Sequence, residues 1–190
     1  MSAPTRLPTP LSTSTPAVVR RHTAASGSAG LAITLALQAD FWGPLVDYRE
    51  DTRWTRLLSP RDVAAAVDPS LHPELARAEI WLLSWLPGQG TVLHDHGLSS
   101  GAFAVARGAV AERVVTAGRR GRRARELSAD LVTGRVRMFG PHYVHQVRND
   151  GVVPAVSVHV YAPRLSVMNT YRVQNSRLER IGTEQAGVDW

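Results

Sequence analysis

Residues 87–108 read PGQGTVLHDHGLSSGAFAVARG, and the centre of this stretch is His94-Asp95-His96. Side chains alternate between the two faces of a β-strand, so histidines at positions i and i+2 point to the same side. Their imidazoles can then converge on one ion. An isolated His-x-His pair is more often two surface or hydrogen-bonded histidines than a metal site. A metal site therefore needs support from elsewhere in the chain.

The composition restricts the chemistry that such a site can use. The 190-residue chain contains no Cys, and all 22 of its basic residues are Arg, so Lys is absent as well. This excludes disulfides, thiol nucleophiles, Cys-ligated zinc, iron–sulfur clusters, Schiff-base lysines and a phosphate-loop lysine. Metal ligands must come from Asp, Glu, backbone oxygen or the seven His.

The net charge of +6 is concentrated in two places. Residues 1–30 hold three Arg and no acid, and residues 119–125, RRGRRAR, hold five Arg; the other 14 Arg face 16 acidic residues. No aromatic residue interleaves the 119–125 loop, as single-strand binding would require. We expect a solvated hairpin tip there, and neither a nucleic-acid nor a membrane partner. A polar segment separates Arg20-Arg21 from the next apolar run, which argues against an export signal, so we expect a cytoplasmic location.

Residues 1–28 are rich in Pro, Ser, Thr and Ala, which predicts a disordered tail before a single domain at 29–190. Apolar periodicity predicts a short helix within 29–46, and Ser59-Pro60 predicts the start of a second one that ends near Val67. From Ala78 onward, short strands of 6–9 residues alternate with turn signals, which is typical of an all-β sandwich or barrel. One such signal, residues 149–151, predicts a hairpin.

A second histidine segment, FGPHYVHQVRN, supports the metal site. Together the two segments resemble the paired motifs of the cupin family. The matching residues are Gly88, His94, His96, Gly101 and Gly108 in the first motif, and Gly140, Pro141, His145 and Asn149 in the second. The resemblance implies a small, jelly-roll-like β-barrel with two short N-terminal helices. It also implies that the three histidines, from two strands, meet inside the barrel.

Two positions depart from the cupin pattern. Gly101 stands where many cupins have a Glu ligand, and His142 stands where the second motif usually has Gly. Without the carboxylate, the site has three neutral nitrogen ligands and open positions, which suits Zn, Fe, Cu or Ni better than Mn or Mg. We expect His142 to be structural or to lie at the rim of the pocket.

A further polar pattern lies in PAVSVHVYAP, where Ser157, His159 and Tyr161 alternate along one face of a predicted strand. Two interpretations are open. The three side chains could face water on an amphipathic strand. They could instead form a line of hydrogen bonds in which each residue orients the next and fixes the Tyr hydroxyl.

Taken together, HDH, Gly101, His145 and the Ser157-x-His159-x-Tyr161 pattern resemble bacterial cysteine dioxygenases, which are thiol dioxygenases of the cupin superfamily. The resemblance covers residues 53–173. It implies one Fe(II) per chain, bound by His94, His96 and His145. It also implies that Tyr161 stands beside the iron, held by His159 and Ser157. Animal members cross-link this Tyr to a Cys at the position of Gly101, which this chain cannot do.

The same resemblance aligns residues 53–56, RWTR, with a Tyr-Thr-Arg segment of the family. Arg56 then falls on the arginine that binds the substrate carboxylate, and Trp54 takes the place of a Tyr that also contacts the substrate. A planar guanidinium can bind a carboxylate through two parallel hydrogen bonds. Arg53 is the alternative if the register differs by one strand step.

The predicted function is the oxidation of the thiol of L-cysteine to cysteine sulfinic acid with O2, by a monomer whose partners are a small thiol and O2. One alternative is a dioxygenase for another small thiol, such as 3-mercaptopropionate. Another is a non-catalytic cupin that binds a metal or a small ligand, because a fold alone does not fix function.

Overall fold

The computed structural model describes residues 27–118 and 123–185. The tail predicted for residues 1–28 therefore lies almost wholly outside the described residues, as do residues 119–122 of the arginine loop. The helices are α1 (Gly27–Ala36), α2 (Ala39–Trp42), α3 (Pro60–Ala66) and α4 (His72–Leu75), with 3-10 turns at Gly43–Leu45 and Pro69–Leu71. The strands are β1 (Trp54–Leu57), β2 (Glu79–Trp85), β3 (Leu93–Asp95), β4 (Ser100–Arg107), β5 (Ala109–Thr116), β6 (Arg125–Val132), β7 (Val136–Phe139), β8 (His145–Arg148), β9 (Ala155–Ala162), β10 (Val167–Gln174) and β11 (Arg177–Gln185).

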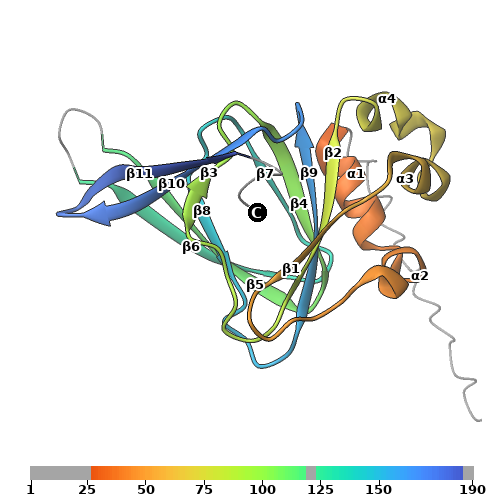
Figure 1. The fold of residues 1–190 in the computed structure, drawn as a ribbon, viewed down its shortest axis with the longest axis horizontal. Helices are drawn as coiled ribbons and strands as arrows, with labels where there is room; N and C mark the ends of the chain where they lie inside the picture. Colours follow the sequence, from red (N-terminus) through yellow and green to blue (C-terminus); the bar gives the residue numbers. More distant parts are fainter. Residues whose placement is uncertain (1–26, 119–122, 186–190) are drawn as a thin grey trace, which may run out of the picture.

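Two antiparallel sheets form the body of the molecule (Figure 1). The five-stranded sheet has the order β1-β2-β9-β4-β7, and the six-stranded sheet has the order β11-β10-β3-β8-β5-β6. The inner faces of both sheets contribute to one apolar cluster that includes Trp85, Phe103, Val110 and Val147. This arrangement confirms the predicted all-β cupin barrel.

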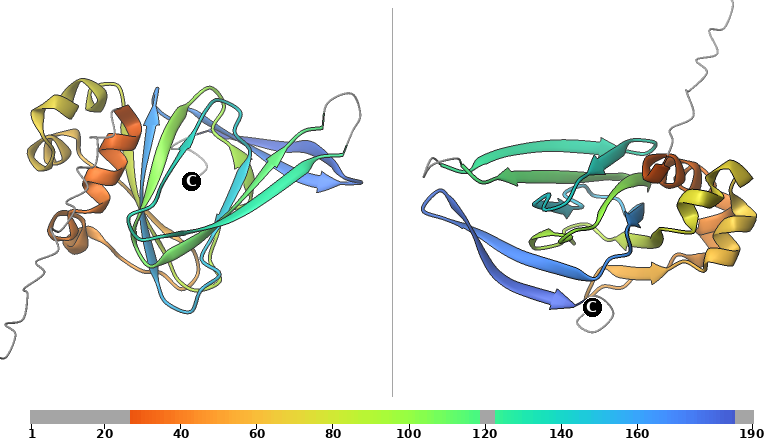
Figure 2. Two further views of the ribbon diagram at one scale, coloured as in Figure 1. Left: turned by 180° about the vertical axis from the view of Figure 1, so that it is seen from behind. Right: turned by 90° about the horizontal axis from the view of Figure 1, so that it is seen from above.

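The helices cover the outer face of the five-stranded sheet (Figure 2). Leu31 and Leu35 of α1 are fully buried there, against a surface that includes the small side chains Ala102 and Ala104 of β4. The two predicted helical regions are confirmed as α1–α2 and α3, and His72-Pro73 begins the additional helix α4. Proline is compatible with that position because the first helical turn needs no N–H donor. No helix in residues 27–118 and 123–185 is long and apolar enough to span a membrane.

The hairpin predicted at residues 149–151 is wrong. β8 belongs to the six-stranded sheet and β9 to the five-stranded sheet, so this turn carries the chain from one sheet to the other. Asn149 is fully buried, and its Nδ2 donates to the carbonyls of Trp85 and Val153. Its Oδ1 accepts from the Gly151 amide, so the turn chemistry is as expected although the strands do not pair.

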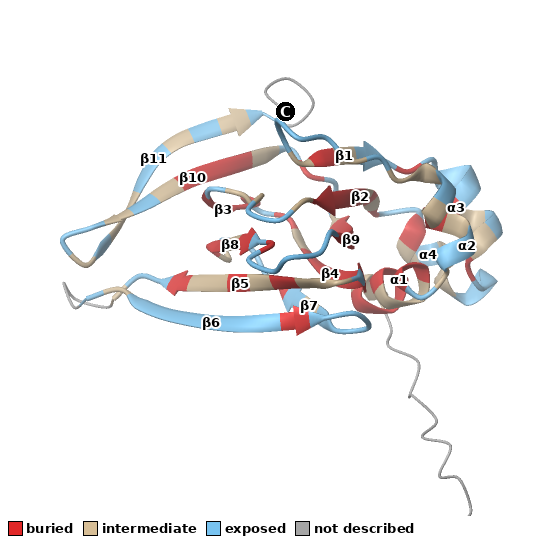
Figure 3. Ribbon diagram, turned by 90° about the horizontal axis from the view of Figure 1, so that it is seen from below, coloured by how far each residue is buried: buried red, intermediate tan, exposed pale blue. Residues whose placement is uncertain are grey.

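The pairs β5–β6 and β10–β11 extend beyond the barrel as ribbons (Figure 3). β5 and β6 pair as far as Thr116 and Arg125, and residues 119–122 of the predicted hairpin tip lie outside the described residues. In β6 only Leu131 is buried, and β11 has no buried residue. Strands β6 and β11 therefore give little signal in the sequence, because a strand that faces water on both sides lacks the alternation that identifies strands.

Candidate metal centre

Three histidines meet inside the barrel. His94 lies in β3, His96 follows that strand, and His145 begins β8, where it pairs directly with His94. All three are buried, and one ligand nitrogen of each lies within 4.8 Å of the others. The His94 and His96 Nε2 atoms are 3.2 Å apart. The sequence motifs therefore led to residues that the fold does bring together.

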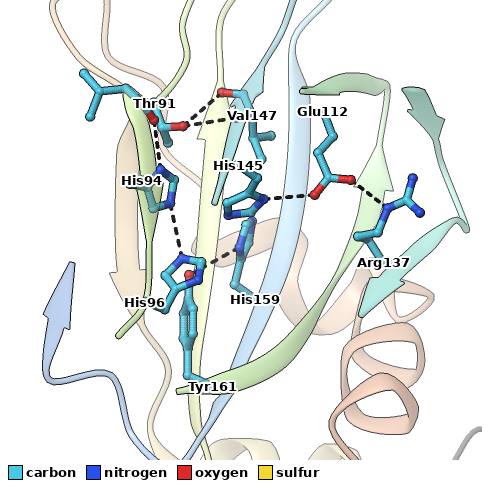
Figure 4. A network of polar contacts seen from close by, with 10 residues as sticks. Thr91, His94, His96, Glu112, Arg137, His145, Val147, His159 and Tyr161 are labelled. Atoms are coloured by element: carbon cyan, nitrogen blue, oxygen red, sulfur yellow. Dashed lines mark hydrogen bonds and ion pairs between the residues drawn. The ribbon is translucent and has the colours of Figure 1, made fainter. Parts of the chain in front are cut away.

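The surroundings of two of these histidines fix which nitrogen faces the centre (Figure 4). His94 Nδ1 donates to the Val92 carbonyl oxygen at 2.9 Å, and His145 Nδ1 donates to Glu112 Oε1 at 2.9 Å. In a neutral imidazole the other nitrogen, Nε2, then carries a lone pair. The buried His145 Nε2 has no hydrogen-bond partner among the described residues. Buried ring nitrogens that converge in this way fit a bound cation.

Burial keeps the imidazoles of His94 and His96 neutral. It lowers the pKa of His94 to about 3, with a further contribution from nearby His145. It also lowers the pKa of His96 well below its ordinary value, with His94 and His145 adding to the effect. Metal binding requires deprotonated imidazole nitrogen, so neither ligand needs to lose a proton first at neutral pH.

Behind His145 lies an acidic residue that the sequence analysis missed. Glu112 of β5 has a fully buried side chain, and its Oε2 forms an ion pair with Arg137 Nε of β7 at 2.6 Å. Its position in the strand could have identified Glu112 as unusual. It shares the inward face of β5 with Val110, where an acidic side chain is rare. No local pattern shows that its partner is His145, which lies 33 residues away.

Ser157, His159 and Tyr161 line the inner face of β9 and are buried, so their exposure to water is excluded. Ser157 Oγ is 2.9 Å from His159 Nε2, and His159 Nδ1 is 3.5 Å from the Tyr161 hydroxyl. Trp85, which the sequence analysis missed, anchors this line because its Nε1 donates to Ser157 Oγ at 2.9 Å. The Tyr161 ring lies 4.9 Å from the ring of His96, so the line ends beside the three histidines.

A cavity of about 30 Å3 connects the two groups of residues. Its lining includes the three histidines, His159 and Tyr161, the aromatic residues Trp81 and Trp85, and Arg53 and Thr55 from the β1 segment.

The chain matches one protein family. A sequence model described as cysteine dioxygenase type I matches residues 71–174, which is more than half of the chain. The chain belongs to the cysteine dioxygenase type I family. Membership and the three-histidine site together indicate a metal-dependent cupin of the dioxygenase type. A comparison with curated protein sequences finds no match.

Among solved structures, the chain is similar to protein TT1209 from Thermus thermophilus, at 24% identity over 64% of this chain and 93% of that chain, with a TM-score of 0.45. A Klebsiella pneumoniae protein with a double-stranded β-helix domain has 16% identity over 74% of this chain and 93% of its own, with a TM-score of 0.44. A Desulfitobacterium hafniense cupin superfamily protein has 18% identity over 63% and 84%, with a TM-score of 0.42.

In this member of the cysteine dioxygenase family, the structure explains why position 101 is glycine. Gly101 of β4 pairs with Tyr161 of β9, and a Cβ at position 101 would overlap with the Val160 carbonyl oxygen. It would also approach Phe139 Cζ to 2.9 Å. No side chain fits, so the carboxylate ligand of other cupins cannot be accommodated on this backbone.

We expect Gly101→Ala to lower the free energy of unfolding by about 3 kcal/mol, because overpacking against backbone cannot be relieved by a rotamer change. Urea denaturation measures the effect. Gly140→Ala is the matched control, since a Cβ at that motif glycine meets nothing within 4 Å. Equal stability of the two variants would contradict the close approach of β4 and β9.

His142 stands where the cupin motif has glycine, and its backbone adopts a conformation that favours glycine. Its φ is 56°, in the left-handed region where glycine is favoured, and its amide donates to the Gly97 carbonyl at 3.0 Å. The His142 side chain is exposed, with Nδ1 3.7 Å from Asp95 Oδ2, on the opposite side of β3 from the metal centre. It lies at the surface and is not one of the three converging histidines.

The two substrate residues predicted from the sequence, Arg56 and Trp54, do not line the cavity. β1 pairs with β2 so that Thr55 lies opposite Leu83, and both line the cavity. Trp54 therefore points to the other face and is buried in the cluster beneath the helices, and Arg56 is exposed. The face of β1 that meets the cavity is the one that carries Thr55, and not the one that carries Trp54 and Arg56. Arg53, the alternative, is the arginine that lines the cavity.

Arg53 brings a positive charge to the cavity. Burial lowers the pKa of Arg53, while Tyr161 and Glu184 oppose the shift, and a guanidinium remains charged in either case. The buried Nε has no hydrogen-bond partner among the described residues. Burial likewise raises the pKa of Tyr161, with the charge of Arg53 acting against it, so the phenol is protonated at neutral pH. An anionic group that entered the cavity would meet a guanidinium and a neutral hydroxyl.

Proposed function

We propose that this chain is an iron-dependent thiol dioxygenase that converts L-cysteine to cysteine sulfinic acid. The observation that carries the proposal is the cavity, where three converging imidazoles, a buried tyrosine and a half-buried arginine surround one small space. Both atoms of O2 are added to sulfur, and the sulfur supplies the electrons, so no external reductant is needed. Family membership supports the reaction class, and the cavity lining supports the substrate.

His94, His96 and His145 would hold Fe(II), which suits imidazole ligands. When bound, the iron would bring thiol and O2 together and lower the pKa of the thiol. We assign the substrate carboxylate to Arg53, whose Nε is buried without a partner among the described residues. A carboxylate that leaves water needs such a partner, because an unpaired buried charge is costly.

Tyr161 would donate a hydrogen bond to the reacting groups. Its hydroxyl stays protonated because burial raises the pKa, and the line through His159 and Ser157 to Trp85 orients it. The apolar and aromatic walls of the cavity, which include Leu83 and Val147, would limit the entry of water.

The direct test is oxygen uptake by the Fe(II)-loaded protein. We expect one O2 to be consumed for each L-cysteine, with the sulfinic acid identified by mass spectrometry. Faster uptake with 3-mercaptopropionate would keep the reaction class and change the substrate. Absence of uptake with every small thiol, from protein that binds iron, would favour the non-catalytic cupin and overturn the proposal.

We also propose, from the sequence, that the chain acts as a cytoplasmic monomer, and sedimentation tests its oligomeric state.

Tyr161→Phe is expected to lower kcat about tenfold without changing iron content, since one hydrogen bond to a reacting group contributes on the order of 1.5 kcal/mol. His159→Ala should have a similar effect by releasing the hydroxyl. Tyr48→Phe is the matched control, because the buried Tyr48 hydroxyl has no partner among the described residues and packs with the helices outside the barrel. Steady-state kinetics decide the point: unchanged kcat in Tyr161→Phe would remove the hydroxyl from the mechanism.

A further inference from the structure

Within residues 27–118 and 123–185 the three-histidine centre has no carboxylate ligand, yet a carboxylate lies directly behind one of its histidines. Glu112 Oε1 is 2.9 Å from His145 Nδ1, and the Glu112 side chain is fully buried. Its other oxygen meets Arg137, whose side chain reaches the surface with 35% of its area exposed. The two contacts join three strands, β5, β7 and β8, around a single buried acid.

Burying a carboxylate is costly unless it is paired and hydrogen-bonded. Glu112 meets this condition through Arg137 on one side and His145 on the other, and the hydroxyl of Tyr143 also interacts with it. Val110, its neighbour on the same face of β5, belongs to the apolar core. An apolar side chain at position 112 would fit this core without the free-energy cost of burying a charge. The presence of an acid is therefore best explained by its contact with His145.

The three histidines differ in what they bond on the side away from the centre. His94 Nδ1 bonds a neutral backbone carbonyl, that of Val92. His96 Nδ1 is buried with no hydrogen-bond partner among the described residues. Among the three, His145 alone bonds a carboxylate. A histidine that donates to a carboxylate is a stronger metal ligand than one that donates to a carbonyl, because the negative charge raises the basicity of the other nitrogen.

We propose that Glu112 is a positioning residue that supplies the negative charge which position 101 cannot provide. It holds His145 with Nδ1 protonated and Nε2 directed to the centre, and it passes anionic character to the metal through that histidine. Arg137 holds the Glu112 carboxylate in place. A side chain at position 101 would overlap with Val160, so no carboxylate ligand fits there. The negative charge of Glu112 would instead act on the metal through His145.

The experiment compares metal binding in wild type and Glu112→Gln. The Gln side-chain oxygen can still accept from His145 Nδ1, so the variant removes charge while keeping the hydrogen bond. We expect Fe(II), bound anaerobically in competition with a chelator, to bind 10- to 100-fold more weakly. We also expect the Fe(III)/Fe(II) potential to become more positive, because an anion favours the higher oxidation state. Glu126→Gln is the matched control, since Glu126 forms an ion pair with Arg113 on the same hairpin but is exposed and, among the described residues, bonds none of the three histidines.

A second variant keeps the test decisive if Glu112→Gln does not fold because Arg137 is left without its partner. The double variant Glu112→Gln, Arg137→Met removes both charges, and we expect the same loss of affinity and the same direction of the potential. A folded variant of either kind that binds Fe(II) within twofold of wild type, at an unchanged potential, would overturn the inference. The inference rests on the proposed iron site: if wild type itself binds no iron, both fall, whereas equal binding by wild type and variant removes only the role of Glu112.

Discussion

His94→Ala is expected to abolish thiol oxidation and to leave the purified protein with little bound iron. The centre has three neutral ligands and no carboxylate, so the loss of one leaves two imidazoles, too few to hold Fe(II) at the protein concentrations of an assay. The barrel should still fold, because its core residues, such as Trp85 and Phe103, pack independently of any metal. Metal analysis, oxygen uptake and circular dichroism measure the three quantities.

His94 is the ligand best suited to this test. Its Nδ1 bonds only a backbone carbonyl, whereas replacement of His145 would also strand the buried Glu112. His142→Asn is the matched control, since His142 is exposed, lies close in the sequence to His145, and adopts a left-handed conformation that Asn tolerates. Full iron occupancy in folded His94→Ala would show that the ligand set is wrong.

Local sequence was sufficient for the features that depend on strand alternation. Each group lies within one short segment: the pair His94 and His96, and the line Ser157, His159 and Tyr161. Period-2 alternation therefore predicts that the side chains of each group share one face, without knowledge of the fold. The convergence of His145 on His94 depends on the pairing of β3 with β8. This convergence could be predicted because the two motifs resemble those of a known family. The residues around His145 alone do not indicate which strand it pairs with.

The features that sequence analysis missed depend on contacts between distant segments. Whether Arg53 or Arg56 faces the cavity is set by the register of β1 on β2, and a four-residue strand with polar residues on both faces gives no periodic signal for that register. The partner of Glu112 lies on another strand, and so does that of Ser157, which is Trp85. At residues 149–151 the turn chemistry was correct, but whether the chain pairs with itself or changes sheet is decided by the whole barrel.

The register of β1 leads to the second large effect, on substrate selection. Arg53→Gln is expected to lower kcat/KM for L-cysteine about 10- to 100-fold, because a charge-assisted hydrogen bond contributes on the order of 1.5–3 kcal/mol. Cysteamine has the same thiol and amine without the carboxylate, so it should be a poor substrate of the wild type. Its kcat/KM should hardly change in the variant.

Arg56→Gln is the matched control, because it makes the same substitution three residues away on an exposed side chain. We expect it to behave as wild type with L-cysteine, cysteamine and 3-mercaptopropionate, measured as kcat/KM from oxygen uptake.

If Arg56→Gln lost the preference for L-cysteine and Arg53→Gln kept it, the carboxylate would bind outside the cavity that contains the three histidines. If cysteamine matched L-cysteine on the wild type, no carboxylate contact would exist, and the assignment of L-cysteine would fall with it. A preference for 3-mercaptopropionate that Arg53→Gln removes would keep the role of Arg53 and show that the amine is not needed for recognition.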